Sequence, residues 1–207
     1  MIVTNAAAVR CAVNDWARMG RAVLVTGAAL VMTATHLTST AQAKGEPPRG
    51  CAHAHARVAE TPRSQLQRAV VCLINQQRTR RGLPRLRESQ RLNRSAQGWT
   101  NQMVRHDFFS HGANFAGRIT AVGFDWSMAG ENIATGFPTP AAVVRGWMGS
   151  PGHCRNILTP SFLDVGVGVS RRGVPGGGPG TWTQDFGLPM SAHAPSGNWG
   201  PASRCPY

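Results

Sequence analysis

Five side chains that could serve a chemical site lie beside turns or helix ends in the second half of the chain. They are His111, Glu131, Ser150, His153 and Cys154. Two histidines and one carboxylate form a known ligand set for zinc that leaves a fourth position open for water. Because side chains at turns and helix ends can point into a cleft, the sequence indicates His111, Glu131 and His153 as candidate ligands of a divalent metal.

Other catalytic arrangements find less support in the sequence. The chain has no nucleophile elbow, phosphate-binding loop, dinucleotide fingerprint or HExxH pair. A Ser-His-Glu triad built on Ser110 or Ser150 lacks a strained turn that would present the serine. Cys154 is a poor nucleophile if a disulfide consumes its thiol. A structural interpretation also stays open, in which the histidines, Glu131 and Asn132 form a hydrogen-bonded network that fixes the loops.

Helical patterns precede and separate these candidates. Thr61 and Pro62 offer a hydroxyl N-cap and a first-turn proline, and apolar residues follow at helical spacing as far as a C-cap at Gly82. We expect the arginines of this helix, Arg78 among them, to stay in solvent. Further helices are predicted over residues 87–106, over 118–122, and from Thr139 through Trp147, where the turn at 150–152 must stop the last one.

Two strands follow the helices. Asp164–Ser170 alternates valine with glycine, and residues 181–188 return after a long glycine-rich loop. We expect the glycine-bearing face of the first strand to let a ligand approach the backbone closely. Helices followed by an antiparallel hairpin predict an α+β fold.

The chain divides into four predicted segments. Residues 1–43 are predicted as a signal peptide, 44–60 as a flexible linker, 61–188 as the folded domain and 189–207 as a Gly/Pro-rich tail. The apolar run over 22–34 is too short to cross a bilayer comfortably, and Ala-Gln-Ala at 41–43 has the small-x-small pattern of a cleavage site. We predict cleavage after Ala43, with an uncleaved membrane anchor as the alternative and Met19 as a second candidate start.

Cysteine usage agrees with export. Removing the leader takes one of the five cysteines and leaves Cys51, Cys72, Cys154 and Cys205. An even set in an oxidising compartment indicates two disulfides, although spacing leaves three pairings open. We favour Cys72 with Cys154 and Cys51 with Cys205, a pair that would tie the two ends of the exported chain together.

The charge balance indicates an anionic partner. The formal net charge is +13, and the predicted leader carries three arginines and one aspartate, so the exported chain keeps +11. Such a charge can serve nucleic-acid binding, but no aromatic residues alternate with the arginines between Arg57 and Arg105 to stack on bases. We therefore expect an anionic wall polymer, a lipid or a membrane surface as partner, no nucleic acid, and a monomer.

Five motifs in order carry a family resemblance. They are FFSH, GENIA, W-x-x-SPGH-x-x-NIL, GVGV and TWTQDFG, spread over residues 66–188. The chain thereby resembles the CAP superfamily (cysteine-rich secretory proteins, antigen 5 and pathogenesis-related 1), in particular its secreted bacterial SCP-like members. The resemblance implies a CAP-type three-layer α-β-α sandwich with a mainly antiparallel central sheet and a shallow cavity.

The same resemblance implies the residues of that cavity. In the family two histidines and two acids line it, and by motif His111, Glu131 and His153 correspond to three of them. The fourth position, an acid in many eukaryotic relatives, falls on Ser150, so the resemblance implies a three-ligand metal site rather than a full set of four. Asn132, next to Glu131 in GENIA, is added to the expected cavity lining.

Two functional hypotheses follow. The first is a secreted or cell-envelope binding module whose cavity takes a lipid, a wall polymer or a divalent metal. The alternative is a zinc-dependent hydrolase or peptidase in which Zn bound by His111 and His153 acidifies a water, with Glu131 as third ligand or general base. Fold alone does not choose between them.

Overall fold

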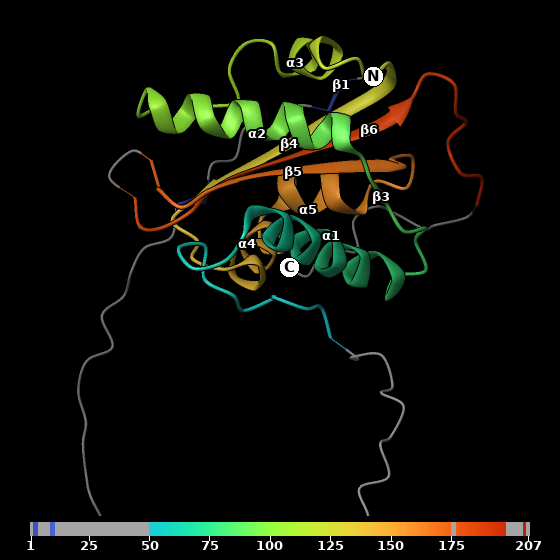
Figure 1. Cartoon of the computed structure of the whole chain (residues 1–207). Helices are drawn as coiled ribbons and strands as arrows, with labels where there is room; N and C mark the ends of the chain where they lie inside the picture. The colour runs from blue at the N-terminus through green and yellow to red at the C-terminus, as the bar shows by residue number, and fades with distance from the viewer. Residues whose placement is uncertain (1, 4–8, 11–49, 175–176, 198–204, 206–207) are drawn as a thin grey trace, which may run out of the picture. The chain divides into compact units, whose positions relative to one another are not determined.

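The chain folds into a β-sheet with helices on both of its faces (Figure 1). The computed structural model describes residues 2–3, 9–10, 50–174, 177–197 and 205. The predicted cleavage site and all of the predicted signal peptide except residues 2–3 and 9–10 lie outside the described residues, so the leader stays a prediction.

Three long strands make the centre of the sheet. β6 (Thr181–Pro189) runs antiparallel to β4 (Trp126–Thr135) on one side and to β5 (Asp164–Ser170) on the other. Shorter parallel pairs flank them, with β3 (Arg87–Glu88) along β5 and with β1 (Ile2–Val3) and β2 (Val9–Arg10) along β4. The expectation of an α+β fold with a mainly antiparallel sheet is confirmed.

The helices of the described residues form the two outer layers. α2 (Gln90–Arg105) and α3 (Phe115–Ala121) cover one face, while α1 (Arg63–Thr79), α4 (Pro140–Met148) and α5 (Pro151–Leu158) cover the other (Figure 1). The expected three layers are thus present. No helix within the described ranges has both the length and the apolar character needed to cross a membrane.

Strand alternation decides which side chains meet which helix layer. Consecutive residues of a strand point to opposite faces. On β4, Ala129 belongs to the core cluster under α2 and α3, whereas Ala134 belongs to the larger core with α1, α4 and α5. Glu131 therefore faces the α2 and α3 layer, and Asn132 faces the layer that contains α5.

The glycine face of β5 receives a helix rather than a ligand. A Cβ at Gly166 would lie 2.1 Å from the backbone of Leu92, and one at Gly168 would lie 2.3 Å from the Ala96 carbonyl oxygen. The glycines therefore let the backbone of α2 press against the sheet. Our expectation of close ligand approach at this face is wrong, because a neighbouring helix already fills the space.

Several helix boundaries differ from the sequence prediction. The predicted N-cap Thr61 and C-cap Gly82 are wrong, because α1 is capped by Pro62 without a side-chain bond and by Arg80. α3 begins at Phe115 rather than at 118.

α2 begins at Gln90 rather than at 87, because Arg87 and Glu88 pair with β5 and Ser89 then caps the helix. The turn at residues 150–152 does not only end α4. Ser150 also occupies the N-cap position of α5, and Pro151 its first turn.

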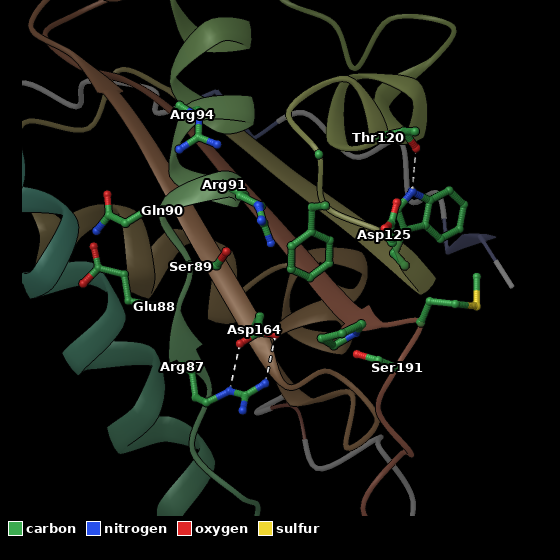
Figure 2. Close-up of a pocket in the computed structure, with 15 residues that line it drawn as sticks. Arg87, Glu88, Ser89, Gln90, Arg91, Arg94, Thr120, Asp125, Asp164 and Ser191 are labelled. Atoms are coloured by element: carbon green, nitrogen blue, oxygen red, sulfur yellow. Dashed lines mark hydrogen bonds and ion pairs between the residues drawn. The ribbon is translucent and has the colours of Figure 1, made fainter.

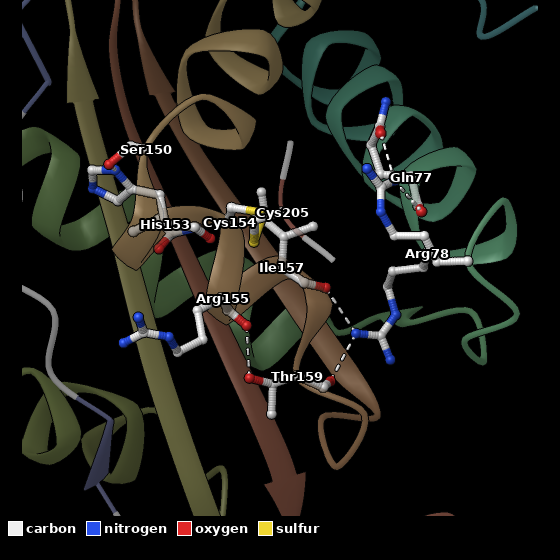
Figure 3. The surroundings of a disulfide bond; sticks show 11 residues. Gln77, Arg78, Ser150, His153, Cys154, Arg155, Ile157, Thr159 and Cys205 are labelled. Carbon is white, nitrogen blue, oxygen red and sulfur yellow. Dashed lines mark hydrogen bonds between the residues drawn. A yellow bond between two sulfur atoms is a disulfide. The ribbon is translucent and has the colours of Figure 1, made fainter. Parts of the chain in front are cut away.

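Arg78 is buried rather than wet. It is 0% exposed, and its guanidinium donates to the carbonyl oxygens of Ile157 and Thr159 (Figure 3). It also donates to the carbonyl oxygens of Phe162 and Pro84. Burial lowers its pKa to about 10. The helical pattern missed this position because a guanidinium surrounded by carbonyl oxygens can replace an apolar side chain in a core.

The disulfides pair differently from our expectation. Cys51 is bonded to Cys72 and Cys154 to Cys205, so the expected pairs Cys72–Cys154 and Cys51–Cys205 are wrong. The first bond fastens Cys51 to α1, and the second fastens Cys205 to α5. Spacing could not distinguish this arrangement from a bond between the two ends.

The segment before α1 is fixed along the part that the structure describes. Val58 is 1% exposed and its N–H donates to the Pro138 carbonyl, while the Ala54 carbonyl accepts from the N–H of Ala141. Together with the Cys51 disulfide, these contacts hold residues 50–60 against α4 and α1. The described part of the expected flexible linker, residues 50–60, is therefore held by contacts, and residues 44–49 lie outside the described residues.

Candidate functional site

Glu131 forms the centre of the candidate site. Its side chain is 1% exposed, and each of its two carboxylate oxygens accepts a hydrogen bond from a different residue. His111 Nδ1 lies 2.8 Å from Oε1, and an Arg118 guanidinium nitrogen lies 2.5 Å from Oε2. Since a carboxylate only accepts, His111 donates through Nδ1, and its Nε2 carries the lone pair when the ring is neutral.

The loop that carries His111 is held by Trp99 of α2. The indole N–H donates to the Ser110 carbonyl at 3.0 Å, and the Arg118 guanidinium stacks 3.7 Å from the indole ring centroid. Gly112, at φ +67°, turns the chain directly after His111, and a Cβ there would strike the indole ring at 2.8 Å. One aromatic side chain thus orients both partners of Glu131.

His153 reaches the site from the first turn of α5 (Figure 3). It is 0% exposed, and its Nδ1 lies 2.9 Å from the hydroxyl oxygen of Ser150. At an N-cap position a serine hydroxyl normally accepts a backbone N–H of the first turn, but that of Ser150 makes no such bond. The hydroxyl is used to hold an imidazole instead of capping its helix.

Both imidazoles keep their second nitrogen free. Nε2 of His111 and Nε2 of His153 are buried, and neither has a hydrogen-bond partner. Burial first, and the nearby His111 ring second, lower the pKa of His153 to about 4. His153 is therefore neutral at pH 7, and when its Nδ1 donates to Ser150, Nε2 presents a lone pair.

Asp185 belongs to the site, and sequence reasoning missed it. It is paired with Glu131 across the β4–β6 ladder, so both carboxyl groups lie on the same face. It is 1% exposed, and neither of its oxygens has a hydrogen-bond partner. Burial first, and the charge of Glu131 second, raise its pKa well above 3.8. An acid inside the apolar strand TWTQDFG was the available signal.

Asn132 lies away from this group, in a buried network beneath it. Its Nδ2 donates to the Gln184 side chain and to the His153 carbonyl, and its Oδ1 accepts from Asn156. Asn156 also donates to the Glu131 carbonyl at 3.1 Å. The network fastens α5 to β4 and β6, so Asn132 positions the helix that carries His153, and its place in the cavity lining stays a prediction.

The candidate ligands do not assemble as three. Within the described part of the chain, no group of three or more His, Cys, Asp or Glu side chains has an arrangement that could hold a metal ion. Cys154 is excluded as a ligand by its disulfide. What the residues offer is two free imidazole nitrogens, with Glu131 behind His111 in the place of an orienting carboxylate.

A cavity with described walls lies elsewhere on the molecule (Figure 2). It measures about 1250 Å³ and opens at the start of α2 and the end of β6. Its arginines are Arg87, Arg91 and Arg94, and its acids are Glu88, Asp125 and Asp164, with Arg87 and Asp164 joined in a two-point ion pair. The charges balance, so this cavity shows no preference for an ionic ligand.

Sequence comparison identifies similar bacterial proteins. The sequence profile described as the cysteine-rich secretory protein family (CAP) matches residues 71–186. The uncharacterized protein YkwD of Bacillus subtilis is 36% identical over 127 residues, which cover 59% of this chain and 47% of YkwD. The uncharacterized membrane protein YlbC of the same organism is 32% identical over 110 residues, 51% of this chain and 32% of YlbC. This chain thus matches less than half of each relative's length.

Structure comparison agrees at the level of the fold. An extracellular protein containing an SCP domain from Bacillus anthracis matches with a TM-score of 0.55 and 29% identity over 60% of this chain and 41% of that one. A cysteine-rich secretory protein of Staphylococcus aureus matches with a TM-score of 0.54 and 16% identity over 62% and 40% of the two chains. The second likeness concerns the fold alone.

Proposed function

Because the chain belongs to the cysteine-rich secretory protein (CAP) family, we propose that it is an exported binding module whose cavity takes a divalent transition metal through His111 and His153. The observation that carries this proposal is the pair of buried, unpartnered Nε2 atoms. Imidazole nitrogen is a preferred ligand for zinc, and two such donors leave positions for water or a bound molecule.

The hydrogen bonds behind the histidines support this donor role. Glu131 accepts from Nδ1 of His111, and Ser150 contacts Nδ1 of His153. Metal-bound histidines almost always use their other ring nitrogen in this way, which fixes the ring and its tautomer. Ser150 thereby has a use at the position where many eukaryotic relatives carry an acid.

Export is supported by the relatives and by the cysteines. The Bacillus anthracis protein is described as extracellular, and the two disulfides suit an oxidising compartment. We propose that the chain is secreted or bound to the cell envelope.

The hydrolase alternative meets an obstacle at Glu131. A general base needs a carboxylate that is free to take a proton, and both oxygens of Glu131 are held by His111 and Arg118. Breaking the buried pair with Arg118 would leave a charge without its partner. The binding role needs no such rearrangement.

Calorimetric titration of the exported protein with zinc chloride tests the proposal. We expect one bound ion per chain, at least about tenfold weaker binding in His153→Gln, and unchanged binding in the exposed control His106→Gln. Equal affinity in all three proteins, or no binding, would contradict the proposal. Zinc-dependent peptide turnover that is lost in Glu131→Gln would favour the hydrolase instead.

A further inference from the structure

A groove rimmed by three arginines lies outside the histidine site. It measures about 530 Å³ and is formed by the start of α1, by α2, and by the end of β5 and the residues that follow it. Arg63, Arg171 and Arg172 line it and are exposed. Val58 and Leu66 lie beneath the same groove, and at 1% and 2% exposure they leave the arginines as its main contact surface.

The three guanidinium groups have no counter-charge. Neither an ion pair nor a side-chain hydrogen bond of Arg63, Arg171 or Arg172 occurs among the described residues, and no acid lines the groove. Glu60, two residues from the groove's Val58, pairs instead with Arg57 at 3.5 Å. The groove therefore differs from the larger cavity of Figure 2, where acids match the arginines.

The backbone under two of these arginines is fixed. The Arg171 carbonyl accepts from the N–H of Gly180, the Arg172 carbonyl accepts from the Thr181 hydroxyl at 2.6 Å, and the Arg172 N–H donates to the Ser170 hydroxyl at 3.1 Å. Because these bonds hold both Cα positions, less order has to be imposed when a ligand binds.

We infer that this groove binds successive phosphate groups of a soluble anionic polymer. Arginine forks contact phosphate oxygens in pairs, and three arginines without an acid line the groove. No aromatic side chain lines the groove to stack a nucleobase. This inference rests on the proposed function only for export of the protein, and it does not depend on metal binding at the histidine site.

A membrane surface fits the groove less well. The exposed large hydrophobic side chain of the described residues is Met190, which lines the other cavity. Peripheral membrane binding combines basic charge with apolar side chains that enter the lipid, and this rim offers charge alone. A soluble polyphosphate is therefore the first probe.

The experiment compares two charge-matched double variants of the exported protein. Arg171→Gln with Arg172→Gln removes two charges from the groove. Arg145→Gln with Arg155→Gln removes two exposed arginines from α4 and α5. Binding of linear polyphosphate, of a neutral polyol polymer and of phosphatidylglycerol vesicles is measured at several salt concentrations.

We expect polyphosphate to bind the wild type and the α4/α5 variant alike, and the groove variant about tenfold or more weakly with a shallower salt dependence. The neutral polymer should not bind. Equal weakening in both variants would assign binding to diffuse surface charge and overturn the inference, as would binding to vesicles without binding to polyphosphate. His153→Gln should bind polyphosphate normally, so the groove and the metal site are tested separately.

Discussion

At the residue scale, the Ser150 hydroxyl makes no cap bond to the first turn of α5 and instead forms a hydrogen bond with Nδ1 of His153. We therefore predict that Ser150→Ala weakens zinc binding roughly tenfold and costs about 1–3 kcal/mol of stability, because Nδ1 of the buried His153 loses its hydrogen-bond partner. Thr139 is the matched control, since its hydroxyl accepts from the Ala142 N–H at the start of α4. Thr139→Ala should cost about 1 kcal/mol of stability and spare zinc affinity. Zinc affinity in the titration separates the two variants, and unchanged affinity in Ser150→Ala would contradict this role of Ser150.

Asp185 should make stability depend on pH. Its pKa is raised in the folded protein above the ordinary 3.8, so the unfolded chain loses this proton first as the pH rises. Stability from this group is therefore complete below about pH 4 and declines as the pH rises towards the folded pKa. We predict that Asp185→Asn melts a few degrees higher than the wild type at pH 8 and that the difference vanishes near pH 4. A constant difference across that range would contradict this assignment.

The residues of the site were predictable to different degrees. His111, Glu131 and His153 could be named from motifs beside turns. The separate role of each residue could not be predicted, because it depends on which ring nitrogen of His111 contacts Glu131 and which of His153 contacts Ser150. Asp185 was hidden because its partner across the sheet lies 54 positions earlier, and only strand register brings the two carboxyl groups together.

At the element scale, the glycines of β5 set how closely α2 approaches the sheet. We predict that Gly168→Ala destabilises the fold by about 3 kcal/mol, because its Cβ would lie 2.3 Å from the Ala96 carbonyl oxygen and the backbone must move to relieve the overpacking. Gly98→Ala, on the exposed side of α2 with nothing within 4 Å, should stabilise the protein by about 1 kcal/mol. Denaturant unfolding of both variants measures the contrast, and similar effects would contradict it.

The sequence pattern predicted whether a segment is a helix or a strand more reliably than it predicted where that segment begins and ends. The hairpin of β5 and β6 and the helices α1, α2 and α4 were all predicted within a few residues. β4 was not predicted as a strand, because GENIA has no alternation of apolar and polar residues. Both faces of β4 are covered by helices, so alternation is not needed.

At the scale of the whole molecule, the two disulfides act on different loops. Cys51 and Cys72 are 21 residues apart, and Cys154 and Cys205 are 51 apart. Loop-closure entropy gives about 3 kcal/mol for the first and about 4 kcal/mol for the second. We predict that replacing the second pair with serine lowers the melting temperature more. Peptide mapping of the oxidised protein should recover these two pairs, and a Cys72–Cys154 peptide would contradict the structure.

The buried Arg78 has a consequence for how the molecule opens. Its guanidinium is satisfied only while Ile157, Thr159 and Phe162 all present their carbonyl oxygens. If that stretch detached alone, Arg78 would lose three hydrogen bonds and keep only the one to the Pro84 carbonyl, so partial opening is strongly penalised. The end of α5 should therefore behave as part of the most cooperative unit, and its amide hydrogens should exchange with solvent only when the entire domain unfolds.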